Sequence, residues 1–458
     1  MFIEQIYTSC LSQASYYIES NGQAAIIDPL RDPEPYLKLA TSRKAEIKYV
    51  FETHFHADFV SGHIDLAQLT GAPIIFGPGA ETGYEITVAE DRQVFSIGNV
   101  MLKVLHSPGH TLESSCYLLL DPQGKEHAIF TGDTLFIGDV GRPDLMGGVA
   151  TKEELAGHMY ASLNAIIKPL PNEVLVYPAH GPGSSCGQNI GPETWSTIGE
   201  QKKNNPALQD MSASEFIESI TTGLKAPPPY YFTDAAINKR GYQELAAVMK
   251  RNYTALSTKS FANYIDQGAV VLDSRTAREF EKGFVQGAVN IGLDGRYAIW
   301  VGTLLDHSVP LLIVADPGKE KEAISRLARV GYEQVHGYLD GGFQSWKTNG
   351  MPCDTITSIS ADQLAARDDI DSILDVREPE EYQDQCLVHA KNIPLPTLEN
   401  ALHLVDDKQL FYVHCQTGYR SMTASSILKR NGIRNFINIA GGMDGIQKTS
   451  LKLKHKGV

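Results

Sequence analysis

Short apolar runs alternate with amphipathic segments along the second half of the chain. PLLIV at 310–314 is followed by a polar loop and an amphipathic stretch that ends at Gly331, and LFYV at 410–413 is followed in the same way by a stretch that ends at Gly432. Apolar runs of this length predict buried strands, and the stretches that end at glycine predict helices. Because strands alternate with helices, we expect parallel sheets covered by helices.

The same pattern occurs twice in this half of the chain. VVLDSRTAREFEKGFVQGAVNI at 270–291 is matched by SILDVREPEEYQDQCLVHAKNI at 372–393. The offset is about a hundred residues, which is the length of a small domain. We therefore predict two copies of one α/β domain, at 251–352 and 353–458.

The first half of the chain has a different pattern. Its apolar runs, among them AAIIDP, PIIF, MLKVL and AIFTGD, end in polar residues, and helices are expected between them, for example from Lys152 to Ile167. The proline cluster APPPYYF at 226–232, with the helix expected after it, is typical of the exit from a domain. We place the first domain at 1–250, and three domains also suit the length of 458 residues.

Composition and charge argue against several classes of partner. The net charge of −14 is unsuited to nucleic acid, which requires clustered Lys and Arg. No apolar run approaches the length of a membrane span, and the start MFIEQIYTSC lacks the order of a signal peptide. Six cysteines scattered singly do not form a disulfide framework. We expect a cytoplasmic protein with no nucleic-acid or membrane partner, and its acidic surface would suit a homo-oligomer.

Residues that can bind a metal follow the predicted strands of the first domain. In THFHADFVSGH at 53–63 they alternate along the loop that leaves a strand, and HSPGHT, FTGDT and YPAHG add others after later strands. Imidazole and carboxylate groups that meet beside a sheet can coordinate a metal ion. The residues concerned are His54, His56, Asp58, His110, Asp133 and His180.

The order HxHxD, GH, GD and AHG resembles the metallo-β-lactamase superfamily over residues 1–245. The resemblance implies an αββα sandwich of two sheets flanked by helices, so that the chain is multidomain, with α+β and α/β parts. Ester-hydrolysing members such as glyoxalase II usually hold two metal ions and have a histidine directly after the aspartate of the motif. Here that position is Phe59, whose ring has no lone pair to donate. We therefore expect one metal ion.

The remaining ligands favour iron. Two imidazoles and one carboxylate leave three positions open, as in non-haem Fe(II) oxygenases, whereas a zinc hydrolase needs one. HADFVSGHIDLAQLTGAPI, GDTLFIGDVGRPDL and YPAHGPGSSCG resemble the persulfide dioxygenases. That resemblance implies one Fe(II) per chain on His54, His110 and Asp133. The residues that would orient these ligands are His56, Asp58 and His180.

The same resemblance implies the substrates. A low-molecular-weight thiol persulfide, of the glutathione, coenzyme A or cysteine type, would be oxidised by dioxygen to sulfite with release of the thiol. Arg142 and Asp144, in GRPDL, are candidates for binding polar groups of the thiol, and a surface ion pair is an equal alternative. Cys186, in GPGSSCG, either contacts the incoming sulfur near the metal or belongs only to a tight turn.

A second reactive residue follows a strand of the last domain. In VHCQTGYRS, Cys415 is followed by a loop with Gly418 and Arg420 and by a helix expected from about Ser421. Backbone N–H groups of such a loop favour a thiolate or persulfide on the cysteine. CQTGYR and DVREPEEY resemble the rhodaneses, in which Cys415 would carry sulfur. The first copy has Asp316 at this position, and since a carboxylate does not accept sulfane sulfur, this copy resembles an inactive rhodanese.

Together these features indicate one pathway. The first domain would make sulfite, and Cys415 would transfer a second sulfane sulfur to sulfite to give thiosulfate; the reverse direction, which makes persulfide from thiosulfate, is also open. The order of domains resembles bacterial fusions of persulfide dioxygenase and rhodanese that detoxify sulfide. The alternatives are a glyoxalase II-like zinc thioester hydrolase, against which Phe59 argues, and a non-enzymatic persulfide carrier or sensor.

Overall fold

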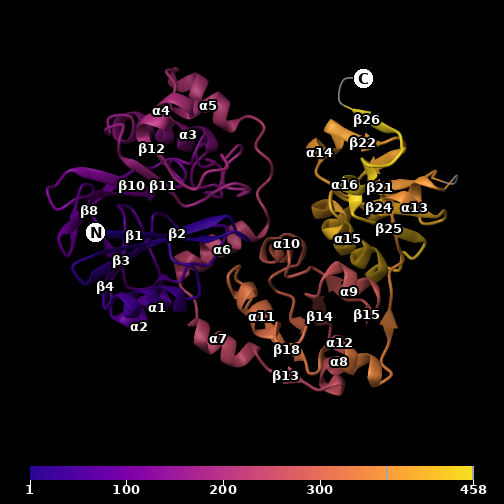
Figure 1. The fold of residues 1–458 in the computed structure, drawn as a ribbon. Helices are drawn as coiled ribbons and strands as arrows, with labels where there is room; N and C mark the ends of the chain where they lie inside the picture. The colour runs from indigo at the N-terminus through magenta and orange to yellow at the C-terminus, as the bar shows by residue number, and fades with distance from the viewer. Residues whose placement is uncertain (368–369, 456–458) are drawn as a thin grey trace. The chain divides into compact units, whose positions relative to one another are not determined.

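The computed structural model describes residues 1–367 and 370–455. The chain divides into two compact units (Figure 1). The first unit comprises residues 1–248 and 328–331, and the second comprises residues 249–327 and 332–458. Apart from residues 328–331, both copies of the repeat therefore belong to the second unit.

The first unit contains two six-stranded sheets. The first sheet has the order β1 (Phe2–Thr8), β2 (Gln13–Ser20), β3 (Gln23–Ile27), β4 (Glu46–Phe51), β5 (Ile74–Phe76), β6 (Thr87–Val88). The second sheet has the order β12 (Ser196–Thr197), β11 (Leu175–Pro178), β10 (Glu126–Gly132), β9 (Ser115–Leu120), β8 (Val100–His106), β7 (Val94–Ile97).

The main core lies between these two sheets. Successive side chains of a strand face opposite sides of its sheet. Tyr16, Ile27 and Phe130 belong to the core between the sheets. Tyr17 and Ile26, their neighbours on β2 and β3, pack instead into a second core on the outer face of the first sheet. Both faces of the sheet are therefore buried.

Helices cover the two outer faces of this sandwich (Figure 1). The helices on the first sheet are α1 (Glu34–Arg43) and α2 (His63–Thr70). The helices on the second sheet are α3 (Lys152–Ser162), α4 (Ile198–Asn204) and α5 (Ala213–Thr221). The expected αββα sandwich is confirmed.

The helix expected from Lys152 to Ile167 changes its geometry part of the way along. α3 begins with a capping box at Thr151 and ends at Ser162, and Leu163–Ile167 continue as a π-helix. The wider turn is closed by the backbone N–H of Lys168, which donates to the carbonyl oxygen of Leu163 at 2.9 Å.

The proline cluster is followed by α6 (Tyr230–Arg240) and α7 (Leu245–Asn252). α6 does not simply leave the domain. It packs onto the first unit, and Tyr230, Tyr231, Asp234 and Ile237 are buried. This helix therefore contributes to the site described below.

The second unit contains two five-stranded parallel sheets with the same strand order. The first has the order β13 (Ala255–Leu256), β18 (Val335–Leu339), β17 (Leu311–Val314), β14 (Val270–Asp273), β16 (Val289–Asn290). The second has the order β20 (Ser358–Ser360), β25 (Phe436–Ala440), β24 (Phe411–His414), β21 (Ile373–Asp375), β23 (Ala390–Asn392). The predicted repeat of one α/β fold is confirmed.

Helices join the parallel strands of each copy. In the first copy they are α8 (Thr258–Asp266), α9 (Ala277–Glu281), α10 (Tyr297–Leu304), α11 (Glu320–Ala328) and α12 (Gly342–Thr348). In the second copy they are α13 (Ala361–Ala365), α14 (Pro379–Asp384), α15 (Tyr419–Arg430) and α16 (Gly442–Ile446). Two short antiparallel pairs complete the unit: β15 (Phe284–Val285) with β19 (Cys353–Asp354), and β22 (Gln385–Leu387) with β26 (Leu453–His455).

Each of the two copies also contains the same kind of buried polar network. Arg275 binds Asp273 at 2.6 Å, and the amide of Asn290 donates to the carbonyl oxygens of both residues at 2.9 and 3.0 Å. The second copy repeats these contacts, with 2.7 Å for the ion pair and 2.9 and 3.0 Å for the amide. The equivalent residues are Asp375, Arg377 and Asn392. Because buried polar groups require partners, this network helps to specify the same fold twice.

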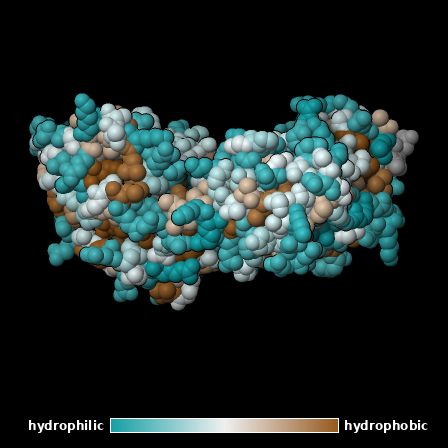
Figure 2. Space-filling model, turned by 90° about the horizontal axis from the view of Figure 1, so that it is seen from below, coloured by the Kyte–Doolittle hydropathy of each residue, from teal (hydrophilic) through white to brown (hydrophobic). Residues whose placement is uncertain are grey.

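Among the described residues, no helix combines the length and apolar character that crossing a membrane requires. On the face drawn in Figure 2, hydrophobic residues lie in separate groups between hydrophilic ones. Isolated groups of this kind are normal at a protein surface.

Candidate metal centre and candidate thiol site

The metal-capable side chains of the first unit converge at strand ends. The loop after β4 carries His54, His56 and Asp58; His110 lies between β8 and β9; Asp133 follows β10; and His180 follows β11. Each of them has an exposed fraction of 4% or less. Residues far apart in the sequence therefore meet in one buried place.

His54, His110 and Asp133 form the first group, with ligand atoms within 4.8 Å of one another. Asp133 Oδ2 is 3.4 Å from His110 Nε2 and 3.9 Å from His54 Nε2. Two ligand atoms of one metal ion lie about 3 to 4 Å apart. Neither carboxylate oxygen of Asp133 has a hydrogen-bond partner among the described residues. Because a buried carboxylate without partners is costly, this arrangement fits a cation.

Hydrogen bonds turn both imidazole rings toward the centre of this group. His110 donates from Nδ1 to the carbonyl oxygen of Arg142 at 2.8 Å, which leaves Nε2 with the lone pair. Thr53 donates its hydroxyl to Asp28 at 2.9 Å and so accepts from His54 Nδ1 at 3.0 Å. Burial and the neighbouring histidines lower the pKa of His54 well below its usual value, so the ring is neutral, as metal binding requires.

Two glycines allow the backbone to come close at this site. Gly132, with φ 52°, precedes Asp133, and a Cβ on it would lie 2.6 Å from Thr53 Oγ1. A Cβ on Gly141 would lie 2.2 Å from the carbonyl oxygen of Asp133. Any larger residue would therefore displace the aspartate or the loop that carries His54.

His56, Asp58 and His180 form a second group, whose ligand atoms also lie within 4.8 Å of one another. His180 Nδ1 donates to the carbonyl oxygen of Ser12 at 3.2 Å. Its Nε2 lies 3.6 Å from Asp58 Oδ2 and 3.5 Å from Asp133 Oδ1. Asp133 thus lies between the two groups, and the side chains present include enough donors for a second ion.

His56, however, directs one ring nitrogen away from the other donors of its group. Its Nε2 lies 3.2 Å from Asp28 and 3.5 Å from Glu52. Burial favours the neutral ring, but the carboxylates of Asp28, Glu52 and Asp58 outweigh burial and raise the pKa of His56 to about 9. Phe59 is fully buried, and its ring centroid is 4.4 Å from that of His56. The residue that replaces a histidine of the hydrolytic motif therefore packs against His56 and offers no ligand atom.

Asn238, in α6, holds the metal loop in place. Its side-chain amide donates to the carbonyl oxygens of His56 and Phe59, both at 2.8 Å, and its oxygen accepts from the backbone N–H of Ser61 at 3.0 Å. No sequence motif marks Asn238, because its partners lie 177 to 182 positions away in the chain. Only the fold identifies it as a positioning residue.

Cys186 lies beside the metal-capable residues. Its Sγ is within 4.8 Å of ligand atoms of Asp133 and His180, and 3.9 Å from the hydroxyl of Tyr231. Burial, followed by the nearby carboxylates of Asp58 and Asp133, raises the pKa of Cys186 well above its usual value. Its neutral thiol therefore faces the site. Tyr231, which belongs to α6, is a further residue that the sequence did not indicate.

Arg142 and Asp144 bind each other. The guanidinium donates to both carboxylate oxygens, at 2.6 and 2.8 Å, and also to the carbonyl oxygens of Ser185 and Lys225. Arg142 is 6% exposed. The pair has the geometry of an internal ion pair, and it fastens the loop whose carbonyl group orients His110.

Cys415 directly follows β24 in the second unit and is 1% exposed. The backbone N–H of Gly418 donates to its Sγ, with an N to S distance of 3.1 Å. Gly418 has φ 107°, a conformation that glycine readily adopts. α15 begins at Tyr419, before the start near Ser421 that the sequence predicts. The sulfur of Cys415 therefore accepts a hydrogen bond from the loop that leads into the N-terminus of α15.

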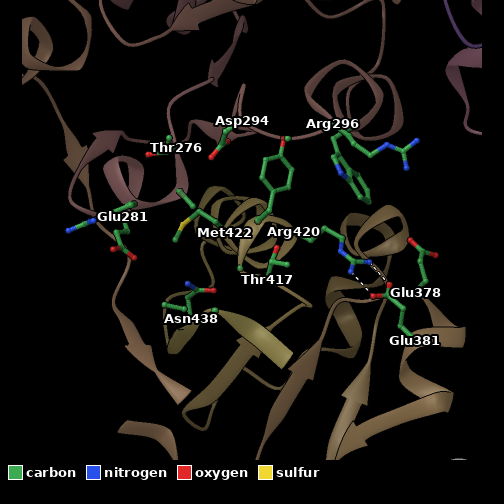
Figure 3. A pocket seen from close by; sticks show the side chains of 18 residues that line it. Thr276, Glu281, Asp294, Arg296, Glu378, Glu381, Thr417, Arg420, Met422 and Asn438 are labelled. Carbon is green, nitrogen blue, oxygen red and sulfur yellow. Dashed lines mark hydrogen bonds and ion pairs between the residues drawn. The ribbon is translucent and has the colours of Figure 1, made fainter. Parts of the chain in front are cut away.

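Arg420 is held by a carboxylate of the same copy. Its two terminal nitrogens donate to Glu381 of α14 at 2.5 and 2.7 Å (Figure 3). Burial raises the pKa of Glu381, but the hydrogen bonds from Arg420 outweigh burial and lower that pKa. The two charges therefore form a bidentate ion pair next to the cysteine loop.

The corresponding loop of the first copy is arranged differently. Asp316 follows β17 at the position of Cys415. The backbone N–H of Lys319, at the position of Gly418, donates to the carbonyl oxygen of Asp316 at 2.9 Å. This loop thus lacks the thiol, and its amide is already used by a backbone acceptor.

Two protein families match most of the chain. The Metallo-beta-lactamase superfamily matches residues 8–180, and the Rhodanese-like domain matches residues 257–349 and 360–449. A probable hydroxyacylglutathione hydrolase of Schizosaccharomyces pombe is 35% identical over 165 residues, which cover 35% of this chain and 60% of that relative. The chain thus spans less than two thirds of the length of this relative.

Solved structures are similar as well. A metallo-beta-lactamase from Staphylococcus aureus is 31% identical with a TM-score of 0.65, and the match covers 74% of this chain and 98% of that chain. ETHE1 from Myxococcus xanthus is 29% identical with a TM-score of 0.45, and the match covers 52% of this chain and 98% of that chain.

Proposed function

Because the chain belongs to the metallo-beta-lactamase superfamily and also carries two rhodanese-like domains, we propose that it is a persulfide dioxygenase fused to a sulfurtransferase. The domain at 1–250 would oxidise a thiol persulfide, and the domain at 353–458 would transfer sulfur through Cys415. The domain at 251–352 would not react, because Asp316 replaces the thiol.

The observation that carries this proposal is the setting of Phe59. Its buried ring packs on His56, and His56 directs Nε2 to two carboxylates. Phe59 adds no ligand atom to the second group, so we assign the single ion to His54, His110 and Asp133, whose ligand atoms lie within 4.8 Å of one another. This donor set is that of non-haem Fe(II) oxygenases. Fe(II) bound there would supply open positions for the persulfide sulfur and dioxygen, and a redox-active ion through which the sulfur passes its electrons to dioxygen.

The reaction balances as one persulfide, one dioxygen and one water giving one thiol, one sulfite and two protons. The residues of the chain would keep the site buried and orient its ligands. Arg142 and Thr53 fix the two rings through their Nδ1 atoms, and the neutral thiol of Cys186 faces the same space. Small thiols of the glutathione, cysteine or coenzyme A type would carry the persulfide.

The sulfur transfer would proceed at Cys415. Its thiolate attacks the outer sulfur of a second persulfide, the S–S bond of that persulfide breaks, and the thiol leaves with the proton. Sulfite then attacks the terminal sulfur on Cys415, which forms thiosulfate and releases the cysteine thiolate. The N–H of Gly418 would stabilise the anionic sulfur in both states.

A second candidate function is hydrolysis of a glutathione thioester. The similarity to a hydroxyacylglutathione hydrolase supports it, and so does the second group of donors, His56, Asp58 and His180. This function would use zinc, and it would require no dioxygen.

The deciding experiment is oxygen uptake by the iron-loaded chain on glutathione persulfide, with analysis of sulfite and thiosulfate. We expect about one dioxygen consumed per sulfite equivalent formed, and thiosulfate as the main product when persulfide is in excess. In Cys415→Ser, oxygen uptake should persist while the product shifts to sulfite. Cys353→Ser, which removes an exposed thiol of the same unit, is the matched control.

Two results would contradict the proposal. Equal turnover without dioxygen, together with cleavage of a hydroxyacylglutathione thioester, would favour the hydrolase. An unchanged ratio of thiosulfate to sulfite in Cys415→Ser would show that Cys415 does not convert the sulfite from the oxidation into thiosulfate.

A further inference from the structure

His414 is the last residue of β24 and lies directly before Cys415. Its side chain is fully buried. It is not one of the described residues that line the pocket of about 990 Å³ beside the Cys415 loop, to which both copies of the repeat contribute (Figure 3). The first copy has Ala315 at this position, so only the second copy has an imidazole there. Any role of this side chain in sulfur transfer must therefore act through the residues that it contacts.

The imidazole of His414 donates a hydrogen bond to the backbone of Cys415. Burial outweighs the nearby carboxylate of Asp375 and lowers the pKa of His414, so the ring is neutral and carries one N–H. Nδ1 lies 3.2 Å from the carbonyl oxygen of Cys415, whereas Nε2 lies 3.6 Å from Asp375 Oδ2 and has no hydrogen-bond partner among the described residues. Because a carbonyl oxygen only accepts, the proton is on Nδ1.

A second donor reaches the same carbonyl oxygen from α16. The backbone N–H of Met443 donates to the oxygen of Cys415 at 2.8 Å. A Cβ on Gly442, which has φ 51°, would lie 2.4 Å from this oxygen, so glycine is needed for the helix to come this close. A carbonyl oxygen has two lone pairs. With His414 and Met443 as donors, both of them are used.

The partners of this oxygen determine what the next amide of the loop can bind. In the second copy, the backbone N–H of Gly418 donates to Sγ of Cys415 at 3.1 Å. In the first copy, the equivalent N–H of Lys319 donates to the carbonyl oxygen of Asp316 at 2.9 Å. Each loop thus has one amide and two acceptors, which are the carbonyl oxygen and the side chain of its first residue. Where the imidazole and α16 occupy the carbonyl oxygen, the amide is left for the sulfur.

We propose that His414 is a positioning residue for sulfur transfer, because its Nδ1–H holds the carbonyl oxygen of Cys415 and thereby keeps the Gly418 amide on the sulfur. The inference rests on the proposed sulfurtransferase function of Cys415 and adds a residue to it. An amide at this place stabilises the charge that develops on sulfur during transfer. Without the imidazole, one lone pair of the carbonyl oxygen is free, and the amide binds it as in the first copy.

The test is sulfur transfer from thiosulfate to cyanide by the full chain. Cys415 takes the sulfane sulfur of thiosulfate and releases sulfite, and cyanide then takes this sulfur and leaves as thiocyanate. Three variants change the donor. His414→Ala removes it, as in the first copy. His414→Asn places an amide nitrogen at the position of Nδ1, and His414→Gln places one near the position of Nε2.

We expect kcat to be about thirtyfold lower in His414→Ala and in His414→Gln, and to stay within about threefold of the unchanged protein in His414→Asn. The KM for thiosulfate should change by less than about twofold in all three variants, because both halves of the reaction lose the same hydrogen bond. His414→Asn and His414→Gln both replace the ring by a buried amide, so a general loss of packing would affect them alike. His403→Asn, at an exposed position of the same copy, is the matched control and should not change kcat.

Nuclear magnetic resonance of the isotope-labelled chain provides a second readout. In the unchanged protein, the imidazole of His414 should carry its proton on Nδ1, and the N–H signal of Gly418 should shift when Cys415 is loaded with sulfur. The same shift should occur in His414→Asn and be absent in His414→Gln. Thermal unfolding compares the stability of these two variants.

The outcomes separate this inference from the function on which it rests. Equal kcat values in His414→Asn and His414→Gln, or an unchanged kcat in His414→Ala, would overturn the positioning role and leave the function of Cys415 intact. In the unchanged protein, a proton on Nε2 alone, or a Gly418 signal that does not respond to sulfur, would overturn it whether or not the variants fold. Transfer that survives in Cys415→Ser would overturn the sulfurtransferase function, and the role of His414 with it.

Discussion

The metal centre and the Cys415 loop are assembled in opposite ways. The metal centre collects buried side chains from loops between positions 54 and 180, and distant residues such as Asn238 hold those loops. The Cys415 loop occupies residues 415–420, and the donor to its sulfur is a backbone N–H three residues further along. A centre of the first kind depends on the whole fold, whereas one of the second kind depends on local backbone conformation.

The two copies of the repeat show the consequence for the second kind. They share strand order and the buried network of aspartate, arginine and asparagine, yet in the second copy a loop amide donates to a cysteine sulfur, whereas in the first copy the equivalent amide donates to a backbone carbonyl oxygen. A few loop residues can therefore remove the chemistry and leave the fold intact. If this is correct, the two centres should function independently, and the Cys415 loop should depend only on its own backbone conformation.

Removal of the shared carboxylate should produce the largest effect. Asp133→Asn takes away the negative charge between the two groups of donors, so we expect loss of bound metal and at least about a thousandfold lower oxygen-dependent turnover. Anaerobic sulfur transfer through Cys415 should not change. Metal analysis and oxygen uptake measure the first effect. Asp210→Asn, at an exposed position, is the control, and a parallel loss of sulfur transfer would show that the centres are not independent.

Moving the thiol to the first copy should not restore sulfur transfer. In the double variant Cys415→Ser with Asp316→Cys, the backbone N–H of Lys319 still donates to the backbone carbonyl oxygen of residue 316. The new sulfur therefore receives no hydrogen bond from this amide. We expect transfer from thiosulfate to cyanide to stay about a hundredfold or more below that of the unchanged protein. Alkylation of the new thiol as a function of pH would report its pKa. Recovery of activity would mean that the cysteine alone suffices.

Addition of an imidazole beside the metal loop should change its metal content. Phe59→His supplies a donor next to Asp58, so the bound metal should rise from one ion toward two per chain, and oxygen-dependent turnover should fall about tenfold. Phe55→His is the control, because the Phe55 ring packs on Phe76 at 4.7 Å. A constant content of one ion in Phe59→His would show that Phe59 does not decide the number of metal ions.

Loss of a distant support should produce the smallest effect. Asn238→Ala leaves the carbonyl oxygens of His56 and Phe59 without their amide donor, which we expect to destabilise the first unit by about 2 kcal/mol. Metal affinity should fall about tenfold. Thermal unfolding and metal titration measure both effects. Asn204→Ala, which removes an exposed hydrogen bond to Glu200, should stay within about 0.5 kcal/mol.

The sequence indicated much of both centres. The repeat at 270–291 and 372–393 predicted two copies of one α/β fold, and the two sheet topologies confirm it. The spacing of metal-capable residues predicted a cluster, and the structure places those residues together. The start of α15 and the end of α3 differ from the predictions, because the loop conformation at Gly418 and the π-turn after Ser162 depend on local packing that periodicity does not record.

What the sequence alone determined is the chemistry that lies in contiguous residues: the Cys415 loop, the alternation of His54, His56 and Asp58, and the substitution of Phe59. The tertiary structure alone decided how Asn238 supports the metal loop, that Arg142 binds Asp144, and that the first copy lines the pocket beside the Cys415 loop. The physical reason is distance along the chain. A hydrogen bond between residues far apart in the chain leaves no periodic pattern in the sequence, and neither does a pocket that such residues line together. Both exist only when the packed elements bring those residues together.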